Sequence, residues 1–252
     1  LVGSEMCIRD RSYAEVDARA NQMAHTFHAR GLRAGDVCAL AMENRPAFFA
    51  CWFGLVKLGV VVAFINTQVS GTPLLHALAS TAAKALVVGE ECLGNLLATA
   101  DLPPLAYWLV GDEENPWSGE LPGFVDRHFA SRLDHAPRSA FPRADRAGIE
   151  AQAPTLLIFT SGTTGLPKAA RYSHMRWLSS GDVMEVTLDA GCEDVFYCCL
   201  PLYHGAAATS VTSTALSAGA AIVVRRRFSA SEFWHDVNRH GITVFQYIGE
   251  IC

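Results

Sequence analysis

The stretch FTSGTTGLPKAA, residues 159–170, combines many hydrogen-bond donors with one cation. Gly162 and Gly165 let backbone N–H groups turn toward one point, because glycine accepts positive φ and has no Cβ. Hydroxyl groups surround the glycines, and Lys168 adds a point charge at the end of the stretch. Such donors bind phosphate oxygens strongly, so the stretch predicts a loop that holds a polyphosphate. The residues expected to bind it are Thr160, Ser161, Gly162, Thr163, Thr164, Gly165, Leu166, Pro167 and Lys168.

A flexible surface turn is the alternative interpretation of this stretch, because turns also use Gly, Ser and Thr. The apolar run TLLIFT at 155–160, directly before the loop, favours the phosphate interpretation. The pattern differs from the P-loop of nucleotide triphosphatases, which needs four residues between its glycines and a hydroxyl residue after its lysine. Here two residues separate Gly162 from Gly165, and Ala169 follows Lys168. A P-loop enzyme is therefore disfavoured.

The elements that must position this loop alternate between helices and unbroken apolar strands. Strands are expected at 36–43, 60–66, 83–89, 106–111, 155–160, 169–174, 194–200, 220–226 and 242–248. Helices are expected at 12–31, 46–58, 71–81, 90–100, from about 175, at 206–217 and at 229–240. This alternation predicts an α/β fold with mainly parallel sheets layered with helices.

The domain organisation follows from changes in composition along the chain. Residues 1–11, LVGSEMCIRDR, resemble a translated DNA-library adapter and are expected to be a non-native, adapter-derived segment. A first subdomain is expected at about 12–111, and an exposed linker rich in Pro, Gly and charge at about 112–153. A phosphate-loop subdomain follows at 154–252. It ends inside an apolar element, so we expect it to be incomplete and the chain to be a fragment.

Composition excludes several classes of function. The formal net charge is −5, which argues against a nucleic-acid partner. The cluster Arg225–Arg227 is most simply a solvated strand end, with a phosphate contact as the alternative. None of the eight cysteines forms a C-x-x-C pair, which argues against a zinc or disulfide framework and favours a reducing cytoplasm. His25 and His28 share a predicted helix face, but no third metal ligand stands near them in sequence.

The longest apolar run, residues 46–65, raises the question of a membrane span. Lys57 and Gly59 interrupt the run, and β-branched residues fill its second half. A buried helix that leads into a buried strand explains this better than a span. A membrane-associated location through peripheral contact remains the alternative to a purely cytoplasmic one.

The phosphate-loop stretch closely resembles the motif of the adenylate-forming superfamily, which comprises acyl-CoA synthetases, luciferases and peptide-synthetase adenylation domains. The resemblance extends through residues 12–61 and through CLPLYHGAAA at 199–208. The segment TVFQYIGE at 243–250 resembles the branch of fatty acid transport proteins and very-long-chain acyl-CoA synthetases. It follows from the resemblance that residues 12–252 are part of an N-terminal AMP-binding domain.

This resemblance implies an acid–thiol ligase that acts on a long- or very-long-chain fatty acid, ATP and CoA. The fatty carboxylate would attack the α-phosphate of Mg-ATP, and CoA would then displace AMP from the acyl-adenylate. Lys168 and His204 are then the catalytic candidates, with the loop holding the β- and γ-phosphates. Tyr203 and His204 would orient the carboxylate and α-phosphate rather than act as a base, because a carboxylate is already ionised at neutral pH.

The resemblance also places Tyr247, Gly249 and Glu250 at the acyl tunnel or its mouth. Taken alone, they could form an ordinary strand end, and His204 could be a structural turn residue. The family's magnesium ligand, adenine-binding segment and mobile lysine would all follow Cys252. We therefore expect this polypeptide alone to make no detectable acyl-CoA.

Three other functions remain open at this point. The chain could belong to an adenylation enzyme for another carboxylic acid, such as an amino acid or aryl acid. It could belong to a lipid uptake or carrier protein without catalysis. A degenerate, non-catalytic relative is disfavoured by the intact set of hydroxyls and Lys168.

Overall fold

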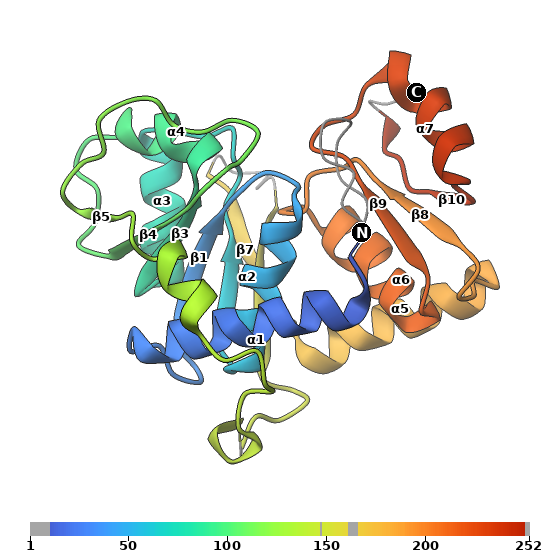
Figure 1. The fold of residues 1–252 in the computed structure, drawn as a ribbon, viewed down its shortest axis with the longest axis horizontal. Coiled ribbons are helices and arrows are strands. Elements are labelled where there is room, and N and C mark those ends of the chain that lie inside the picture. The colour runs from blue at the N-terminus through green and yellow to red at the C-terminus, as the bar shows by residue number, and fades with distance from the viewer. Residues whose placement is uncertain (1–10, 147, 161–165, 250–252) are drawn as a thin grey trace. The chain divides into compact units, whose positions relative to one another are not determined.

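The computed structural model describes residues 11–146, 148–160 and 166–249. The chain divides into two compact units. Unit 1 comprises residues 1–12, 44–46 and 173–252, and unit 2 comprises residues 13–43 and 47–172. Each unit has its own sheet and is described by itself (Figure 1).

Unit 2 is built on a sheet of seven strands in the order β5-β4-β3-β1-β2-β6-β7. From β5 to β6 every pairing is parallel. The central strand β1 aligns Cys38 with Val62 of β2 and with Ala85 of β3. In chain order the strands are β1 (Val37–Ala41), β2 (Val61–Phe64), β3 (Ala85–Gly89), β4 (Ala106–Val110), β5 (Val125–Asp126), β6 (Pro154–Thr160) and β7 (Lys168–Ser173).

Helices cover both faces of this sheet, as a buried parallel sheet requires. Alternate strand residues such as Ala39 and Leu86 pack in one apolar core with side chains of two helices, α3 (Thr72–Thr81) and α4 (Leu93–Leu97). A 3₁₀ turn, η1 (Glu90–Cys92), precedes α4. Two further helices are α1 (Tyr13–Ala29) and α2 (Pro46–Lys57).

The opposite face of the sheet packs through aromatic rings. Phe64 of β2 contacts Phe48 and Trp52 of α2, with ring centroids 5.1 Å apart in both pairs. Trp108 of β4 contacts Phe27 of α1 and stacks on Phe129 at 5.3 Å. The predicted α/β class, with a mainly parallel sheet between helices, is therefore confirmed.

The segment expected to be an exposed linker at 112–153 is only partly so. Residues 113–120 are mostly exposed, but β5 joins the sheet, and 3₁₀ turns form at η2 (Ala130–His135) and η3 (Arg143–Arg146). Phe129, Leu133 and Phe141 are at most 3% exposed. The amide of Gln22 in α1 donates to the carbonyl of Leu133 at 2.8 Å. The linker expectation is wrong for this second half, because its apolar side chains and carbonyls have partners within unit 2.

The boundary expected near residue 154 also differs from the observed division. β6 pairs with β2, aligning Leu156 with Val62, so the strand before the loop belongs to the sheet of unit 2. The division falls instead between Tyr172 and Ser173.

Unit 1 is built on a parallel sheet of three strands in the order β10-β8-β9. Its strands are β8 (Val195–Cys198), β9 (Ala221–Val224) and β10 (Val244–Phe245), and its helices are α5 (His174–Leu188), α6 (Thr212–Ala218) and α7 (Ala230–His240). A π-helical turn, η4 (Ala206–Val211), leads into α6. Tyr197, Cys199 and Val223 form a small core with Phe233 and Phe245.

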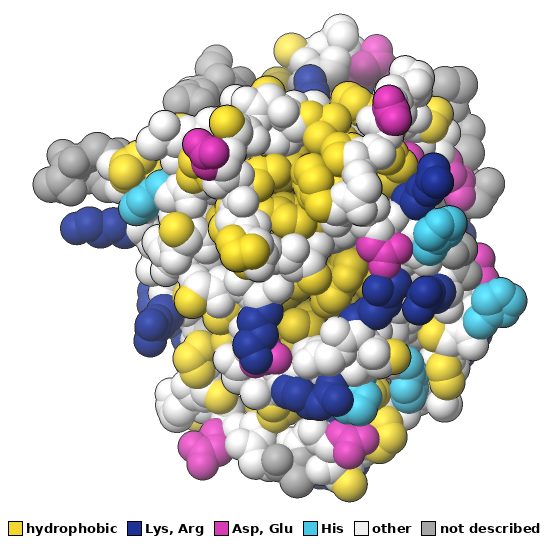
Figure 2. Space-filling view, turned by 90° about the vertical axis from the view of Figure 1, so that its left-hand side faces the viewer, with side chains coloured by type: hydrophobic (Ala, Val, Ile, Leu, Met, Phe, Trp, Pro, Cys, Tyr) yellow, Lys and Arg dark blue, Asp and Glu magenta, His cyan; other side chains and the backbone are white. Residues whose placement is uncertain are grey.

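Part of the molecular surface is apolar. On the side shown in Figure 2, hydrophobic side chains gather in the centre of the face, with Lys and Arg residues beside them. Phe124 of unit 2 is 50% exposed.

The long apolar run at 46–65 divides into α2 and β2 as predicted. No helix in the described ranges is long and apolar enough to cross a bilayer.

Candidate functional site

The two ends of the predicted phosphate loop lie at neighbouring strands of unit 2. Thr160 is the last residue of β6 and Lys168 is the first of β7, and these strands are adjacent in the sheet. The Thr160 hydroxyl donates to the carbonyl of Lys168 at 3.4 Å, the long limit for such a bond. Ser161, Gly162, Thr163, Thr164 and Gly165 lie outside the described residues.

Lys168 differs from the other two lysines of the chain in its environment. Lys57 binds Asp17 at 2.7 Å, and Lys84 binds Asp36 at 2.5 Å. Lys168 is exposed and forms no ion pair with any residue that the structure describes. Its charge is therefore available to a ligand at the edge of the sheet where the loop begins and ends.

His76, which the sequence analysis did not indicate as a site residue, contacts the backbone at the end of the loop. The Nε2 atom of His76, on α3, lies 3.1 Å from the carbonyl oxygen of Pro167. Leu166 beside it is 44% exposed. His76 falls within a predicted helix, and nothing local to its sequence indicates a contact with residues 91 positions away. This contact fixes the backbone directly before Lys168.

The second group of predicted site residues lies in unit 1, on the turn after β8. Tyr203 is 8% exposed and His204 is exposed, with ring centroids 4.5 Å apart. The N–H of His204 donates to the carbonyl of Pro201 at 2.9 Å, which closes the turn. Partial burial of the imidazole lowers the pKa of His204 below its ordinary 6.5, so the neutral ring prevails at pH 7.

The turn leads directly into the π-helical turn η4. The N–H of Ala208 donates to the carbonyl of His204 at 3.0 Å, and the indole N–H of Trp177 donates to the carbonyl of Ala208 at 2.9 Å. Turns of this kind are rare and occur frequently at functional sites. Sequence periodicity predicted an ordinary helix at 206–217, because a π turn leaves no periodic signal over six residues.

The third group follows β10. Tyr247 is 53% exposed, with its ring 5.8 Å from that of Phe245. Gly249 is exposed, and Glu250 lies outside the described residues. Because β10 and β8 are parallel neighbours, the segments that carry Tyr247 and Tyr203 leave the same edge of the unit 1 sheet.

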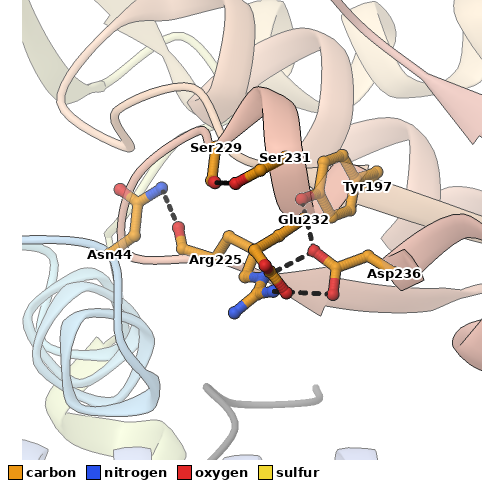
Figure 3. A network of polar contacts seen from close by, with 7 residues as sticks. All are labelled: Asn44, Tyr197, Arg225, Ser229, Ser231, Glu232 and Asp236. Carbon is orange, nitrogen blue, oxygen red and sulfur yellow. Dashed lines mark hydrogen bonds and ion pairs between the residues drawn. The ribbon is translucent and has the colours of Figure 1, made fainter. Parts of the chain in front are cut away.

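A buried ionic network joins β8, the end of β9 and α7 (Figure 3). The guanidinium of Arg225 donates to both carboxylate oxygens of Asp236, at 2.6 and 2.7 Å, and the Tyr197 hydroxyl donates to Asp236 at 2.7 Å. Burial opposes ionisation of Asp236, but the bonds from Arg225 and Tyr197 lower its pKa below 3.8 overall. Burial, followed by the bond to Asp236, raises the pKa of Tyr197. Arg225 is therefore a structural residue, neither a solvated strand end nor a group open to phosphate.

The two histidines noted on α1 pack against one aromatic ring. His25 and His28 flank the ring of Phe141, with ring centroids 5.2 and 5.3 Å away. Nowhere in the described ranges do three or more His, Cys, Asp or Glu side chains form a group that could hold a metal ion.

The chain is similar to known proteins along nearly its whole length. The chain is 39% identical over 248 residues to long-chain fatty acid transport protein 6 of Homo sapiens, an alignment that covers 96% of this chain and 38% of that protein. It is 35% identical over 245 residues to long-chain fatty acid transport protein 2 of Rattus norvegicus, covering 95% of this chain and 38% of the relative. The chain thus spans just over a third of the length of these relatives.

Solved structures share the fold. The N-terminal domain of FACL13 from Mycobacterium tuberculosis superposes with a TM-score of 0.80 at 23% identity, covering 99% of this chain and 58% of that one. The anthranilate CoA ligase AuaEII has a TM-score of 0.80 at 22% identity, covering 94% of this chain and 44% of that one. The model of the family described as AMP-binding enzyme matches residues 6–252. Because this match spans nearly the whole sequence, the chain belongs to the AMP-binding enzyme family.

Proposed function

We propose that this chain carries the phosphate-holding part of an ATP-dependent ligase that joins a long- or very-long-chain fatty acid to CoA. The observation that carries the proposal is the position of Thr160 and Lys168 at the ends of two adjacent strands, on either side of the hydroxyl-rich loop, with Lys168 in no ion pair with a described residue. Family membership supports the use of ATP, and relatives named as long-chain fatty acid transport proteins support a fatty acid as the substrate.

The first step of the proposed reaction is adenylation. A carboxylate oxygen of the fatty acid bonds to the α-phosphorus of ATP, and the bond from that phosphorus to the bridging oxygen breaks to release pyrophosphate. Lys168 and the loop donors would stabilise the charge that develops on the departing β- and γ-phosphates. In the second step the CoA sulfur bonds to the acyl carbon, its proton is lost and AMP leaves.

His204 and Tyr203 are proposed to orient the reacting groups. A neutral imidazole, as its lowered pKa provides, donates one hydrogen bond to an oxygen and adds no charge of its own. Holding the carboxylate in line with the α-phosphate is a main task of such a site, because positioning and electrostatic stabilisation together supply most of the acceleration in phosphate transfer. No proton transfer from the carboxylate is needed at neutral pH.

Tyr247, Gly249 and Glu250 are proposed to contact the acyl chain. Tyr247 and Ile248 are 53% and 45% exposed and offer apolar surface where their segment leaves the sheet. Mg²⁺ would accompany ATP and would neutralise part of the phosphate charge. The cysteine usage supports a cytoplasmic location for this part of the protein, with peripheral membrane contact as the alternative.

Lipid uptake without catalysis is the second candidate function, and the names of the relatives, long-chain fatty acid transport proteins, favour it. Uptake alone has no need of a phosphate-binding cation, so removal of Lys168 separates the two candidates. Uptake that persists after adenylation is lost would favour the carrier.

The test is fatty-acid-dependent exchange of labelled pyrophosphate into ATP. The protein assayed would be long-chain fatty acid transport protein 6 with its matching segment replaced by this chain. We expect exchange in this hybrid and a loss of about 100-fold or more with Lys168→Ala. The matched control Lys84→Ala removes the same charge from the same unit and should exchange normally. A folded hybrid without exchange, or equal losses in the two variants, would overturn the proposal.

A further inference from the structure

The side chain of Asn44 forms hydrogen bonds with three backbone groups of unit 1. The residue lies between β1 and α2, in the short segment 44–46 that belongs to unit 1. Its side chain is 4% exposed. The Nδ2 atom donates to the carbonyl of Leu200 at 2.8 Å and to that of Arg225 at 3.0 Å. The Oδ1 atom accepts from the N–H of Leu202 at 2.7 Å.

These bonds all go to backbone groups of unit 1, and two of them flank one proline. Leu200 and Leu202 stand on either side of Pro201, directly after β8. A proline has no N–H and restricts the residue before it to extended conformations, so this stretch cannot form a regular ladder. The third bond, to Arg225, ties the same amide to the end of β9 (Figure 3). The side chain of Asn44 thus supplies hydrogen bonds to backbone groups that a regular β ladder would otherwise pair.

The stretch that Asn44 fixes is the base of the turn that carries Tyr203 and His204. The carbonyl of Pro201, between the two anchored leucines, accepts the N–H of His204 at 2.9 Å. Downstream, the carbonyl of His204 accepts from Ala208, whose own carbonyl accepts from Trp177. The turn is therefore held at both ends, and Asn44 is the anchor at the upstream end.

The chemistry of the amide explains why the residue is asparagine. Two carbonyl acceptors and one N–H donor converge on the side chain, and a primary amide offers both donors and an acceptor. An aspartate would place an oxygen against two carbonyls, and an alanine would leave three buried backbone groups to find other partners.

We propose that Asn44 is a positioning residue for Tyr203 and His204, whose side-chain amide fixes the turn at 200–204 and so the direction of the imidazole. Its relevance to catalysis rests on the function proposed above, in which His204 orients the carboxylate and α-phosphate. Small displacements of such groups reduce rates strongly, because catalytic geometry must be held closely.

The experiment follows the imidazole of His204 by NMR in the purified 252-residue chain, with the resonance assigned by its absence in His204→Gln. In Asn44→Ala we expect the His204 signal to shift and its pKa to rise toward 6.5, because a loosened turn exposes the ring to water. The matched control is Tyr197→Phe, which removes a different buried hydrogen bond of unit 1 and should leave the His204 titration unchanged.

An unaltered His204 titration in folded Asn44→Ala would overturn the proposal, as would an equal change in Tyr197→Phe. If Asn44→Ala does not fold, Asn44→Ser retains one donor and should give a smaller shift in the same direction. Independently of any variant, the amide proton of Leu202 should exchange slowly in the unaltered chain, and fast exchange would contradict the bond to Asn44. None of these measurements needs ATP or a fatty acid, so their failure is distinct from a failure of pyrophosphate exchange.

Discussion

At the scale of single residues, the availability of one cation decides whether the loop can hold a phosphate. Lys168 has no carboxylate partner among the described residues, whereas Lys57 and Lys84 are each engaged in an ion pair. A lysine that is paired with a carboxylate attracts an anion less strongly, because the carboxylate compensates its charge. No described carboxylate compensates the charge of Lys168, so this charge should attract phosphate more strongly than that of Lys57 or Lys84.

This difference between the lysines predicts how their substitution changes the affinity of the chain for pyrophosphate. We expect Lys168→Ala to weaken binding of inorganic pyrophosphate by about tenfold or more, the loss of one charge-assisted hydrogen bond. Lys84→Ala should change the affinity by less than about twofold, since that charge is already compensated. Isothermal titration calorimetry at constant ionic strength measures both. Equal affinities of the two variants would show that the loop does not use Lys168.

The ion pair in unit 1 gives a prediction about stability. Asp236 is 2% exposed and binds Arg225 through both oxygens, so Asp236→Asn should lower the free energy of unfolding by about 3 kcal/mol at pH 7. Glu232 lies 3.9 Å from the same guanidinium but is 42% exposed, and Glu232→Gln should cost less than about 1 kcal/mol. Urea unfolding at pH 7 measures both changes.

The same pair has a definite pH dependence. The pKa of Asp236 is lower in the folded protein than in the unfolded chain, so its stabilisation is present above the unfolded value, near 3.8. It is lost as the pH falls through the folded value. The stability difference between the unaltered protein and Asp236→Asn should therefore shrink below about pH 4. A difference that stays constant down to pH 3 would contradict this assignment.

At the scale of elements, the contact between α5 and α6 depends on the absence of a side chain at Gly181. A Cβ at this position would lie 2.6 Å from the carbonyl oxygen of Ser213, which is backbone and cannot rotate away. Alanine would add about 1 kcal/mol of helix propensity, but the overlap forces the helices apart. We expect Gly181→Ala to destabilise by about 1–3 kcal/mol net.

Gly191 provides the control for this substitution. A Cβ there would meet nothing within 4 Å, so Gly191→Ala should change stability by less than about 0.5 kcal/mol. Thermal unfolding of both variants measures the difference. A stabilised Gly181→Ala would mean that the helices adjust freely and that helix propensity decides the outcome.

Elements with a strong local pattern could be predicted from the sequence, whereas long-range contacts could not. The transition from helix to strand within residues 46–65 followed from the β-branched second half of that run, and the structure confirms it. The strand expected at 242–248 is only Val244–Phe245, because the extent of pairing depends on its neighbour β8. The buried second half of the segment at 112–153 was missed because its partners lie on α1, more than 100 residues away.

The candidate site shows the same limit. Local composition indicated the loop ends at Thr160 and Lys168, since hydroxyls, glycines and a cation stand next to one another in sequence. The contacts that position the predicted residues come from distant segments. His76 reaches Pro167 across 91 positions, and Asn44 reaches Leu200 across 156. No periodicity or spacing near either residue indicates such a partner.

At the scale of the whole molecule, the two units differ in the size of their sheets and in the number of apolar side chains that they bury. The sheet of unit 2 has seven strands and a large apolar core, whereas that of unit 1 has three strands, one of them only two residues long. Among the described residues, unit 1 buries fewer apolar side chains than unit 2, with Phe196 and Ile222 on the face of its sheet opposite Tyr197 and Val223. Because the stability of a region depends on its buried apolar contacts, unit 1 should open at a lower denaturant concentration than unit 2.

Chemical labelling of the cysteine thiols can measure this difference in stability between the units. Cys38 and Cys51 are buried in unit 2, and Cys198 and Cys199 in unit 1, whereas Cys192 is exposed. Burial raises the pKa of Cys38 and Cys198, and that of Cys199 to about 11, so these thiols react with iodoacetamide only after local or global unfolding.

In increasing urea, we therefore expect Cys192 to be labelled first, then Cys198 and Cys199, and finally Cys38 and Cys51. Peptide mapping by mass spectrometry assigns each label and separates these thiols from Cys7 and Cys252, which lie outside the described residues. Asp236→Asn supplies the control. It should lower the urea concentration at which Cys198 and Cys199 are labelled and leave that for Cys38 and Cys51 unchanged. If Cys38, Cys51, Cys198 and Cys199 all react at one urea concentration in both proteins, the chain unfolds as a single cooperative body. In that case the smaller core of unit 1 has no stability of its own.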